Sequence, residues 1–352
     1  MGASGRRLLA VCAAAVGVAV VPLGAWLLAE RSPTDLGSPA ARTTTEAEER
    51  SERTRSADEE WRWESFGGVE VQVPADWAYG TTGTPPCLQA SDPARTPDGE
   101  DRRARPYVGR PGVVAAIACP EPVADPASRA PYLWFGDSRP AGQRRYDGGW
   151  VEETRVVAGV AITVLSDDAA MRERILGSAR PIGEADSYGC APEHPVVADP
   201  DARPSSDAGG LPGLGDVASL TVCRYARESA RPAPASLLSA SRMEGRAARE
   251  VVDAMIAAPT GTGPNAPGDC AAEFALGDEV MVVHVEGATG ETQEVVVRYS
   301  GCDRHGTDDG VTVRQLTASV TRALLTGPHS PSSLHEGVGR LVRTDRSPAE
   351  PR

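Results

Sequence analysis

The hydrophobic pattern of this chain begins with one long uncharged run, Leu8–Ala29, which follows Arg6 and Arg7. A helix rises about 1.5 Å per residue, so about 20 apolar residues cross the roughly 30 Å hydrocarbon core of a bilayer. The run therefore predicts a single transmembrane helix over residues 8–29. Basic residues favour the cytoplasmic side, so we expect residues 1–7 inside the cell and the rest extracytoplasmic. Cleavage of the run as a signal peptide stays open as the alternative.

Residues 30–60 have almost no hydrophobic positions. Leu36 is their only large aliphatic residue, and Ser, Thr, Pro and charged residues dominate. Such a composition cannot bury enough apolar surface to fold. We predict a disordered stalk that holds the folded part away from the membrane.

Beyond residue 60 the apolar positions fall into two stretches, 61–180 and 217–328, separated by 181–216, which is rich in Pro, Gly, Asp and Ser. Alternating or continuous apolar runs predict strands in both stretches. These runs are Val69–Val73, Val113–Ala118, Glu152–Val157, Val160–Leu165, Val217–Val222, Glu279–Val285 and Glu294–Tyr299. Two pairs of runs flank short turns that contain Gly, at 158–159 and 287–290, and predict β-hairpins.

The clearest predicted helix outside the membrane ends before Pro259. Ser241 and Glu244 form a capping box, in which both side chains bind free backbone N–H groups. Apolar residues at helical spacing follow it: Ala248, Val251, Val252, Met255 and Ile256. Each hairpin should also lead into a helix, from Ser166 or Asp167 to about Ala179 in the first stretch and over 314–326 in the second.

The composition of the chain argues against some partners and predicts small cores. All 36 basic residues are Arg, and the net charge is −13, which becomes −15 without Arg6 and Arg7. An acidic chain argues against binding to nucleic acid and against adsorption to anionic lipid. The chain has 37 Gly and 30 Pro but only three Phe, so we expect small, loop-rich cores that need reinforcement.

The cysteines indicate how that reinforcement is supplied. Cys12 lies in the apolar run, and the other six form sequential pairs 32, 33 and 32 residues apart, each closed by a strand-like run. An even number of cysteines outside the membrane predicts disulfides, although six cysteines allow many pairings. The preferred pairs are Cys87–Cys119, Cys190–Cys223 and Cys270–Cys302. A thiol or metal site is the competing interpretation, but CxxC spacing is absent.

Together these patterns predict an α+β fold. An N-terminal transmembrane helix and a disordered stalk would precede two small disulfide-stapled α+β modules, 61–180 and 217–328. A linker over 181–216 would join the modules, and its Cys190 would be clamped onto the second. A polar disordered tail, 329–352, would follow.

Part of the chain resembles a group of proteins without a known activity. The residues that carry the resemblance are Trp63, Gly68-Val69-Glu70, Val73-Pro74, Asp76-Trp77, Cys87, Pro106-Tyr107-Val108-Gly109 and Cys119-Pro120. In this pattern, over roughly residues 61–120, the chain resembles uncharacterised membrane-anchored extracytoplasmic proteins of actinobacteria. The resemblance implies an exported, anchored protein and no particular catalytic residue.

Catalytic signatures are absent from the sequence: it contains no GxSxG, HExxH, phosphate loop or GxGxxG. The loop Cys302–Gly310 contains Asp303, Asp308 and Asp309, which could converge on a Ca²⁺ ion because Ca²⁺ prefers several oxygen ligands. Their spacing differs from that of an EF-hand, and acidic residues beside Gly are common in turns. We therefore assign no catalytic, cofactor-binding or metal-binding residue.

The aromatic and histidine residues likewise lead to no assignment of a functional residue. Trp61, Trp63, Trp77 and Trp134 could line a carbohydrate-binding groove, but a core poor in Phe is the preferred interpretation. Of the histidines, His284 falls within a strand, His194 in the linker, and His329 and His335 in the tail. None has a recognisable partner in the sequence.

The sequence thus favours a non-catalytic protein, tethered to the cell envelope, that binds cell-wall polymer or another exported protein. One alternative is an exported cell-wall hydrolase whose carboxylate pair is not recognisable locally, because such pairs are set by the fold. Another is a co-sensor for a neighbouring membrane signalling protein. No cofactor is expected.

Overall fold

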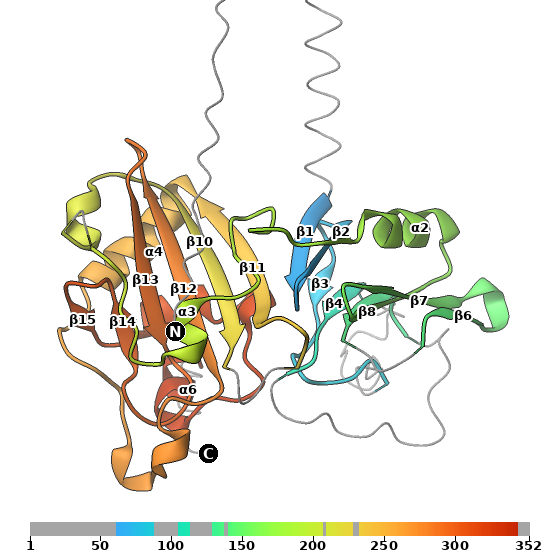
Figure 1. Cartoon of the computed structure of the whole chain (residues 1–352). Helices are drawn as coiled ribbons and strands as arrows, with labels where there is room; N and C mark the ends of the chain where they lie inside the picture. The colour runs from blue at the N-terminus through green and yellow to red at the C-terminus, as the bar shows by residue number, and fades with distance from the viewer. Residues whose placement is uncertain are drawn as a thin grey trace, which may run out of the picture. The chain divides into compact units, whose positions relative to one another are not determined.

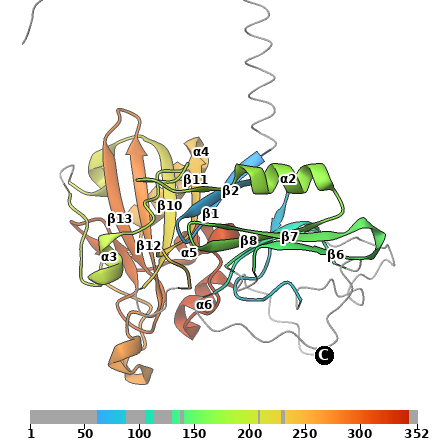
Figure 2. The same cartoon turned by 45° about the vertical axis from the view of Figure 1, so that its right-hand side comes forward.

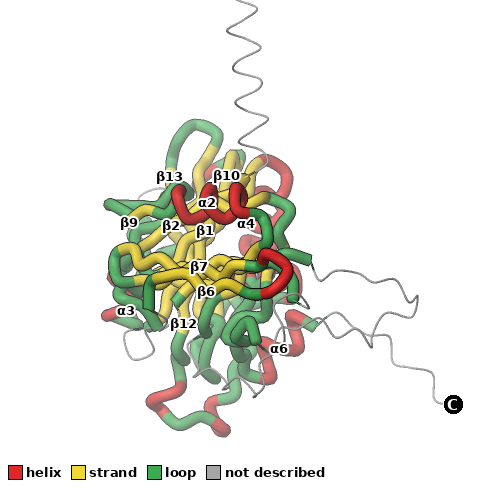
Figure 3. The backbone as a smooth tube through the Cα atoms, turned by 90° about the vertical axis from the view of Figure 1, so that its right-hand side faces the viewer, coloured by secondary structure: helices red, strands yellow, loops and turns green. Residues whose placement is uncertain are grey.

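The computed structural model describes residues 61–87, 105–112, 129–136, 140–206, 209–227 and 232–343, all of which belong to one compact unit. These residues form mostly β-sheet, with fifteen strands and a few short helices (Figures 1 and 3). The prediction of an α+β fold is therefore wrong. Strands such as Trp61–Phe66 and Leu237–Glu244 were not predicted, because polar and apolar residues are mixed in them and give no clear alternation.

The predicted transmembrane helix, 8–29, and the predicted stalk, 30–60, lie outside the described residues. Among the helices that the structure does describe, none combines the length and the apolar character needed to cross a bilayer.

The N-terminal half contains a small sheet and a first large sheet. In the small sheet, β1 (Trp61–Phe66) pairs antiparallel with β2 (Val69–Pro74), which pairs with β9 (Arg180–Pro181). The first large sheet has the order β3 (Ala78–Tyr79), β4 (Tyr107–Gly109), β5 (Tyr132–Phe135), β8 (Val160–Ser166), β7 (Val151–Val157) and β6 (Gly142–Arg145). The helix α2 (Ala169–Ser178) packs on both, and its buried Ile175 and Leu176 join their shared core.

Two predictions for this half are confirmed. The hairpin of β7 and β8 turns at Ala158 and Gly159, whose φ angles of 47° and 80° are both left-handed, as a type I′ turn requires. The helix that follows is also present, although Asp168 caps it by accepting a hydrogen bond from the Met171 N–H. The capping carboxylate thus lies one residue later than expected, and it binds a free N–H group in the first turn of the helix.

The C-terminal half is built on a second large sheet. All its neighbours are antiparallel, in the order β11 (Leu237–Glu244), β10 (Val217–Ala226), β12 (Glu279–Gly287), β13 (Thr292–Arg298), β14 (Gly306–Asp308) and β15 (Val313–Arg314). One face packs against α4 (Gly245–Ile256), α5 (Ala318–Leu324) and α6 (Glu336–Val342). The other face is covered by residues 182–198, which include α3 (Pro195–Ala198) (Figures 1 and 2). Burial on both faces explains the continuous apolar runs of the central strands.

The predicted helix before Pro259 is confirmed as α4, but its predicted capping box is wrong. Ser241 and Glu244 end the strand β11, and Glu244 stands opposite Ser219 of β10. The helix starts directly at Gly245, without a side-chain cap. The Ser and Glu spacing of a capping box occurs here by coincidence, because both residues belong to a strand and not to the first turn of a helix.

The segments expected as linker and tail are also ordered in part. Between residues 181 and 216, Val196, Val197, Leu211 and Leu214 are buried against the second large sheet. In the expected tail, α6 buries Val338 completely. Few apolar residues anchor these segments, so their average composition stays polar and hides the packing.

The halves meet where β1 lies beside β11. The Gly67 N–H donates to the Leu237 carbonyl at 2.7 Å, and Leu238 joins the core that contains Phe66. Gly67 has a φ of 59°, and a Cβ atom there would lie 2.5 Å from the Cβ atom of Ala233. This close approach requires glycine.

Candidate functional site

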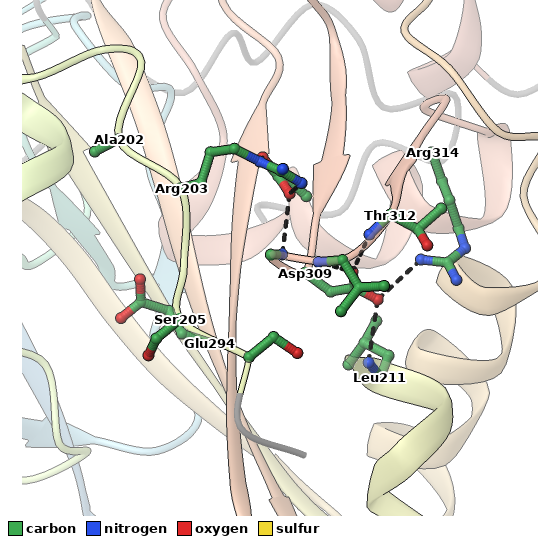
Figure 4. Close-up of polar contacts among 12 residues, drawn as sticks. Ala202, Arg203, Ser205, Leu211, Glu294, Asp309, Thr312 and Arg314 are labelled. Atoms are coloured by element: carbon green, nitrogen blue, oxygen red, sulfur yellow. Dashed lines mark hydrogen bonds and ion pairs between the residues drawn. The ribbon is translucent and has the colours of Figure 1, made fainter. Parts of the chain in front are cut away.

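The acidic loop after Cys302 does not gather its carboxylates. The Arg203 guanidinium donates from Nε and Nη2 to the two oxygens of Asp308, at 2.9 and 2.8 Å. Asp309 instead accepts from the Leu211 N–H at 3.1 Å and from Arg314 Nη1 at 2.9 Å (Figure 4). The two side chains therefore fasten different segments to the sheet.

The protonation of both carboxyl groups agrees with this role. Burial opposes the charge on Asp308, yet the hydrogen bonds from Arg203 and Gly310 outweigh it and lower its pKa. Burial opposes the charge on Asp309 as well, and donors led by the Thr312 N–H lower its pKa. Within the described part of the chain, no group of three or more His, Cys, Asp or Glu side chains is placed to hold a metal ion.

The tryptophans do not form an open platform. Trp77 and Trp134 are buried, with 4% and 5% of their surface exposed, as a core role predicts. Trp61 and Trp63 are partly exposed, but guanidinium groups lie over their rings, Arg174 at 3.8 Å and Arg180 at 4.3 Å from the ring centres. Cation–π contacts of this kind occupy one face of each ring, on which a sugar would otherwise stack.

His329, expected in a disordered tail, is a buried residue with only 3% of its surface exposed. Its Nδ1 lies 2.8 Å from Ser239 Oγ and its Nε2 lies 2.7 Å from Ser241 Oγ. A serine beside a histidine at this distance is the arrangement of an activated nucleophile. No sequence motif marked it, because the partners are 88 and 90 residues apart.

The lowered pKa of His329 argues against catalysis at Ser239 or Ser241. Burial, followed by the positive charges of Arg224 and Arg110, lowers the pKa of His329 well below its ordinary value of 6.5. A general base must accept a proton in the reaction, and here the protonated form is strongly disfavoured. We therefore interpret the Ser–His contacts as structural.

Two further buried carboxylates are paired with arginine. Arg110 Nη2 donates to Glu64 Oε2 at 2.7 Å, and Arg224 lies 3.4 Å from Glu279. The Tyr299 hydroxyl donates to the same Glu279 carboxylate at 2.5 Å. Burial raises the pKa of Tyr299 well above its ordinary range, so it remains a donor. These carboxylates are held by fixed partners inside the protein.

The other histidines are likewise partnered or constrained. His194 caps α3, and its Nε2 lies 3.2 Å from Glu294. Burial lowers the pKa of His284, in β12, and Glu294 only partly opposes the shift. His335 caps α6 through its Nδ1. His194 and His335 thus serve the local fold as helix caps.

Two of the predicted disulfides are present. Cys190 and Cys223 are fully buried, with their Cα atoms 5.6 Å apart, so Cys190 is clamped onto the second large sheet as expected. Cys270 and Cys302 are paired with their Cα atoms 5.9 Å apart, and Cys270 is partly exposed. Cys119 lies outside the described residues, so its pairing with Cys87 stays a prediction.

An open cavity of about 410 Å³ lies beside the Cys270–Cys302 disulfide. Its lining combines small apolar side chains with charged ones: Asp201, Pro267, Cys270, Ala272, Ala275, Leu276, Asp303 and Arg304. Arg304 is ion-paired with Asp201, whereas Asp303 has no ion pair within the described residues. Phe274, next to the lining residues in the sequence, is 63% exposed. This cavity is the candidate functional site.

Comparisons with known proteins add no relative. No known protein family matches the chain, and no curated protein or solved structure is significantly similar to it. The resemblance to membrane-anchored actinobacterial proteins therefore remains a prediction from the sequence.

Proposed function

We propose that this chain is an exported, non-catalytic binding protein, held at the membrane by its Leu8–Ala29 segment, that binds cell-wall polymer or another exported protein. The observation that carries the proposal is the open cavity beside Cys270–Cys302. A cavity that combines apolar side chains with a few charged groups is typical of recognition sites. The disulfides support export, because they persist in oxidising compartments.

The hydrolase alternative finds less support. Such an enzyme needs two carboxyl groups beside its substrate, one acting as acid and the other as base or nucleophile. Asp201 and Asp303 both line the cavity, but Arg304 engages Asp201 in an ion pair. The buried Trp77 and Trp134 belong to other parts of the core and offer the cavity no aromatic wall.

The test uses the full chain, purified in a mild detergent, with isolated cell-wall sacculi. Bound protein and released sugar or peptide fragments are measured in the same tubes, beside a heat-inactivated control. We expect the protein to pellet with the sacculi and to release no fragments. Release above the control would overturn the proposal in favour of the hydrolase. If the protein neither binds nor cuts, crosslinking in intact cells tests the exported-protein partner.

A further inference from the structure

The cavity beside Cys270–Cys302 is lined by three segments, and the two that carry the cysteines are firmly joined. Besides the disulfide, the Ala266 N–H donates to the Cys302 carbonyl at 2.8 Å, and the Asp303 N–H donates to the Ala275 carbonyl at 2.9 Å. Gly277 packs so closely that a Cβ atom there would lie 2.2 Å from the Gly301 nitrogen. The cavity is therefore formed before any ligand arrives, which reduces the entropy lost on binding.

The charges at the rim favour a cation. Asp201 and Arg304 neutralise each other. One oxygen of Asp303 accepts the Arg304 N–H at 2.8 Å, and no cationic side chain among the described residues contacts this carboxylate. Among the described side chains, the rim thus carries one uncompensated negative charge, on a chain whose net charge is −13. An anionic group would be repelled here, whereas an ammonium group would gain a charge-assisted hydrogen bond.

The walls favour an apolar stem behind that cation. Ala272, Ala275, Leu276 and Pro267 supply the apolar part of the lining. A chain of methylene groups can lie along such walls while its charged end stays at the rim, as lysine side chains do on protein surfaces. The exposed Phe274 extends the apolar surface beyond the cavity.

Backbone strain marks the same rim. Arg304 has a φ of 55°, a left-handed conformation that it shares, among the described residues other than Gly, only with Ala158 in its hairpin turn. Such a conformation costs about 1–2 kcal/mol for a residue with a Cβ atom. Strained positions of this kind gather at functional sites, because the surrounding structure must hold them in place.

We propose that this cavity binds a primary amine on a short apolar stem, as in a lysine-type side chain of the partner, with Asp303 as its counter-ion. The inference rests on the proposed binding function and adds the chemical class of the group that is bound. The apolar walls would enclose the stem, and the ion pair of Asp201 with Arg304 would keep Arg304 away from the amine.

The test measures binding of Nα-acetyl-lysine methylamide to the full chain in detergent, by ligand-observed saturation-transfer NMR. The norleucine analogue, which has the same length of stem but no amine, is the matched ligand. Asp303→Asn removes the charge at nearly constant shape, and Asp216→Asn, at the exposed residue directly before β10, is the matched protein control. Ala272→Phe fills the cavity.

We expect Asp303→Asn to weaken binding of the lysine probe by about two- to fivefold, as for loss of one partly exposed ion pair. Asp216→Asn should leave the affinity unchanged, and Ala272→Phe should abolish binding. Equal affinity for the norleucine analogue, or no effect of Asp303→Asn, would overturn the inference. If the variants lose the probe but still pellet with sacculi as the parent does, the cavity is not the wall-binding site and the inference about the partner fails, while the proposed function stands.

Discussion

Acidification should destabilise this protein through His329. The side chain is only 3% exposed, and its neutral ring makes one hydrogen bond to Ser239 and another to Ser241. Arg224 and Arg110 are the charged groups that lower its pKa after burial, and their acidic partners, Glu279 and Glu64, already bind them. Protonation would therefore place a third positive charge in a buried site.

The sign and size follow from linkage. In the unfolded chain His329 has its ordinary pKa of 6.5, whereas in the folded chain the pKa lies well below that value. Below pH 6.5 the unfolded state binds a proton that the folded state does not, so the free energy of unfolding falls as the pH falls. The loss is about 1.4 kcal/mol per pH unit, or about 2 kcal/mol at pH 5, while folded His329 stays neutral.

Urea unfolding of the full chain in detergent, followed by tryptophan fluorescence at several pH values from 7.5 to 5, measures this loss. His329→Gln keeps one donor and one acceptor but cannot become charged, so it should be less stable at pH 7.5 and lose about 2 kcal/mol less on acidification. His284→Gln is the variant for comparison. Burial also lowers the pKa of His284, so this residue too contributes to the loss of stability on acidification. If the parent and His329→Gln show the same pH dependence, the reasoning is refuted.

Three further predictions concern stability, each measured by urea unfolding. Replacing Cys190 and Cys223 by Ser should cost about 3–4 kcal/mol, because the bridge closes a loop with a sequence separation of 33; a cost below about 1 kcal/mol would contradict this. Asp309→Ala should cost about 3 kcal/mol or more, because it leaves the buried Arg314 without its partner. Gly67→Ala should destabilise more than Gly149→Ala, since both have positive φ but only Gly67 has close neighbours; equal effects would refute the steric argument.

The local features of this fold could be predicted from the sequence, whereas its polar contacts could not. Both hairpins, α4 and two disulfides follow from patterns within about 35 residues of the chain. Ser241 shows where such reasoning fails: its spacing from Glu244 is typical of a capping box, yet the hydroxyl binds His329, 88 residues later. Likewise, nothing in the spacing of Asp303, Asp308 and Asp309 indicates that only the first lacks an arginine partner.

Buried charged residues stabilise the fold, and this role separates them from the carboxylate that the proposed function uses. The carbonyl of Pro328 accepts from buried Arg110, and that of Ser330 accepts from buried Arg224, so arginines from both halves hold the segment after α5. A chain with three Phe thus supplements its aliphatic core with buried ion pairs and disulfides. Carboxylates used in this way are no longer available for acid–base chemistry, because losing a partner would leave a buried charge uncompensated. Asp303 differs in that it carries its charge at the rim of an open cavity, where a ligand can reach it.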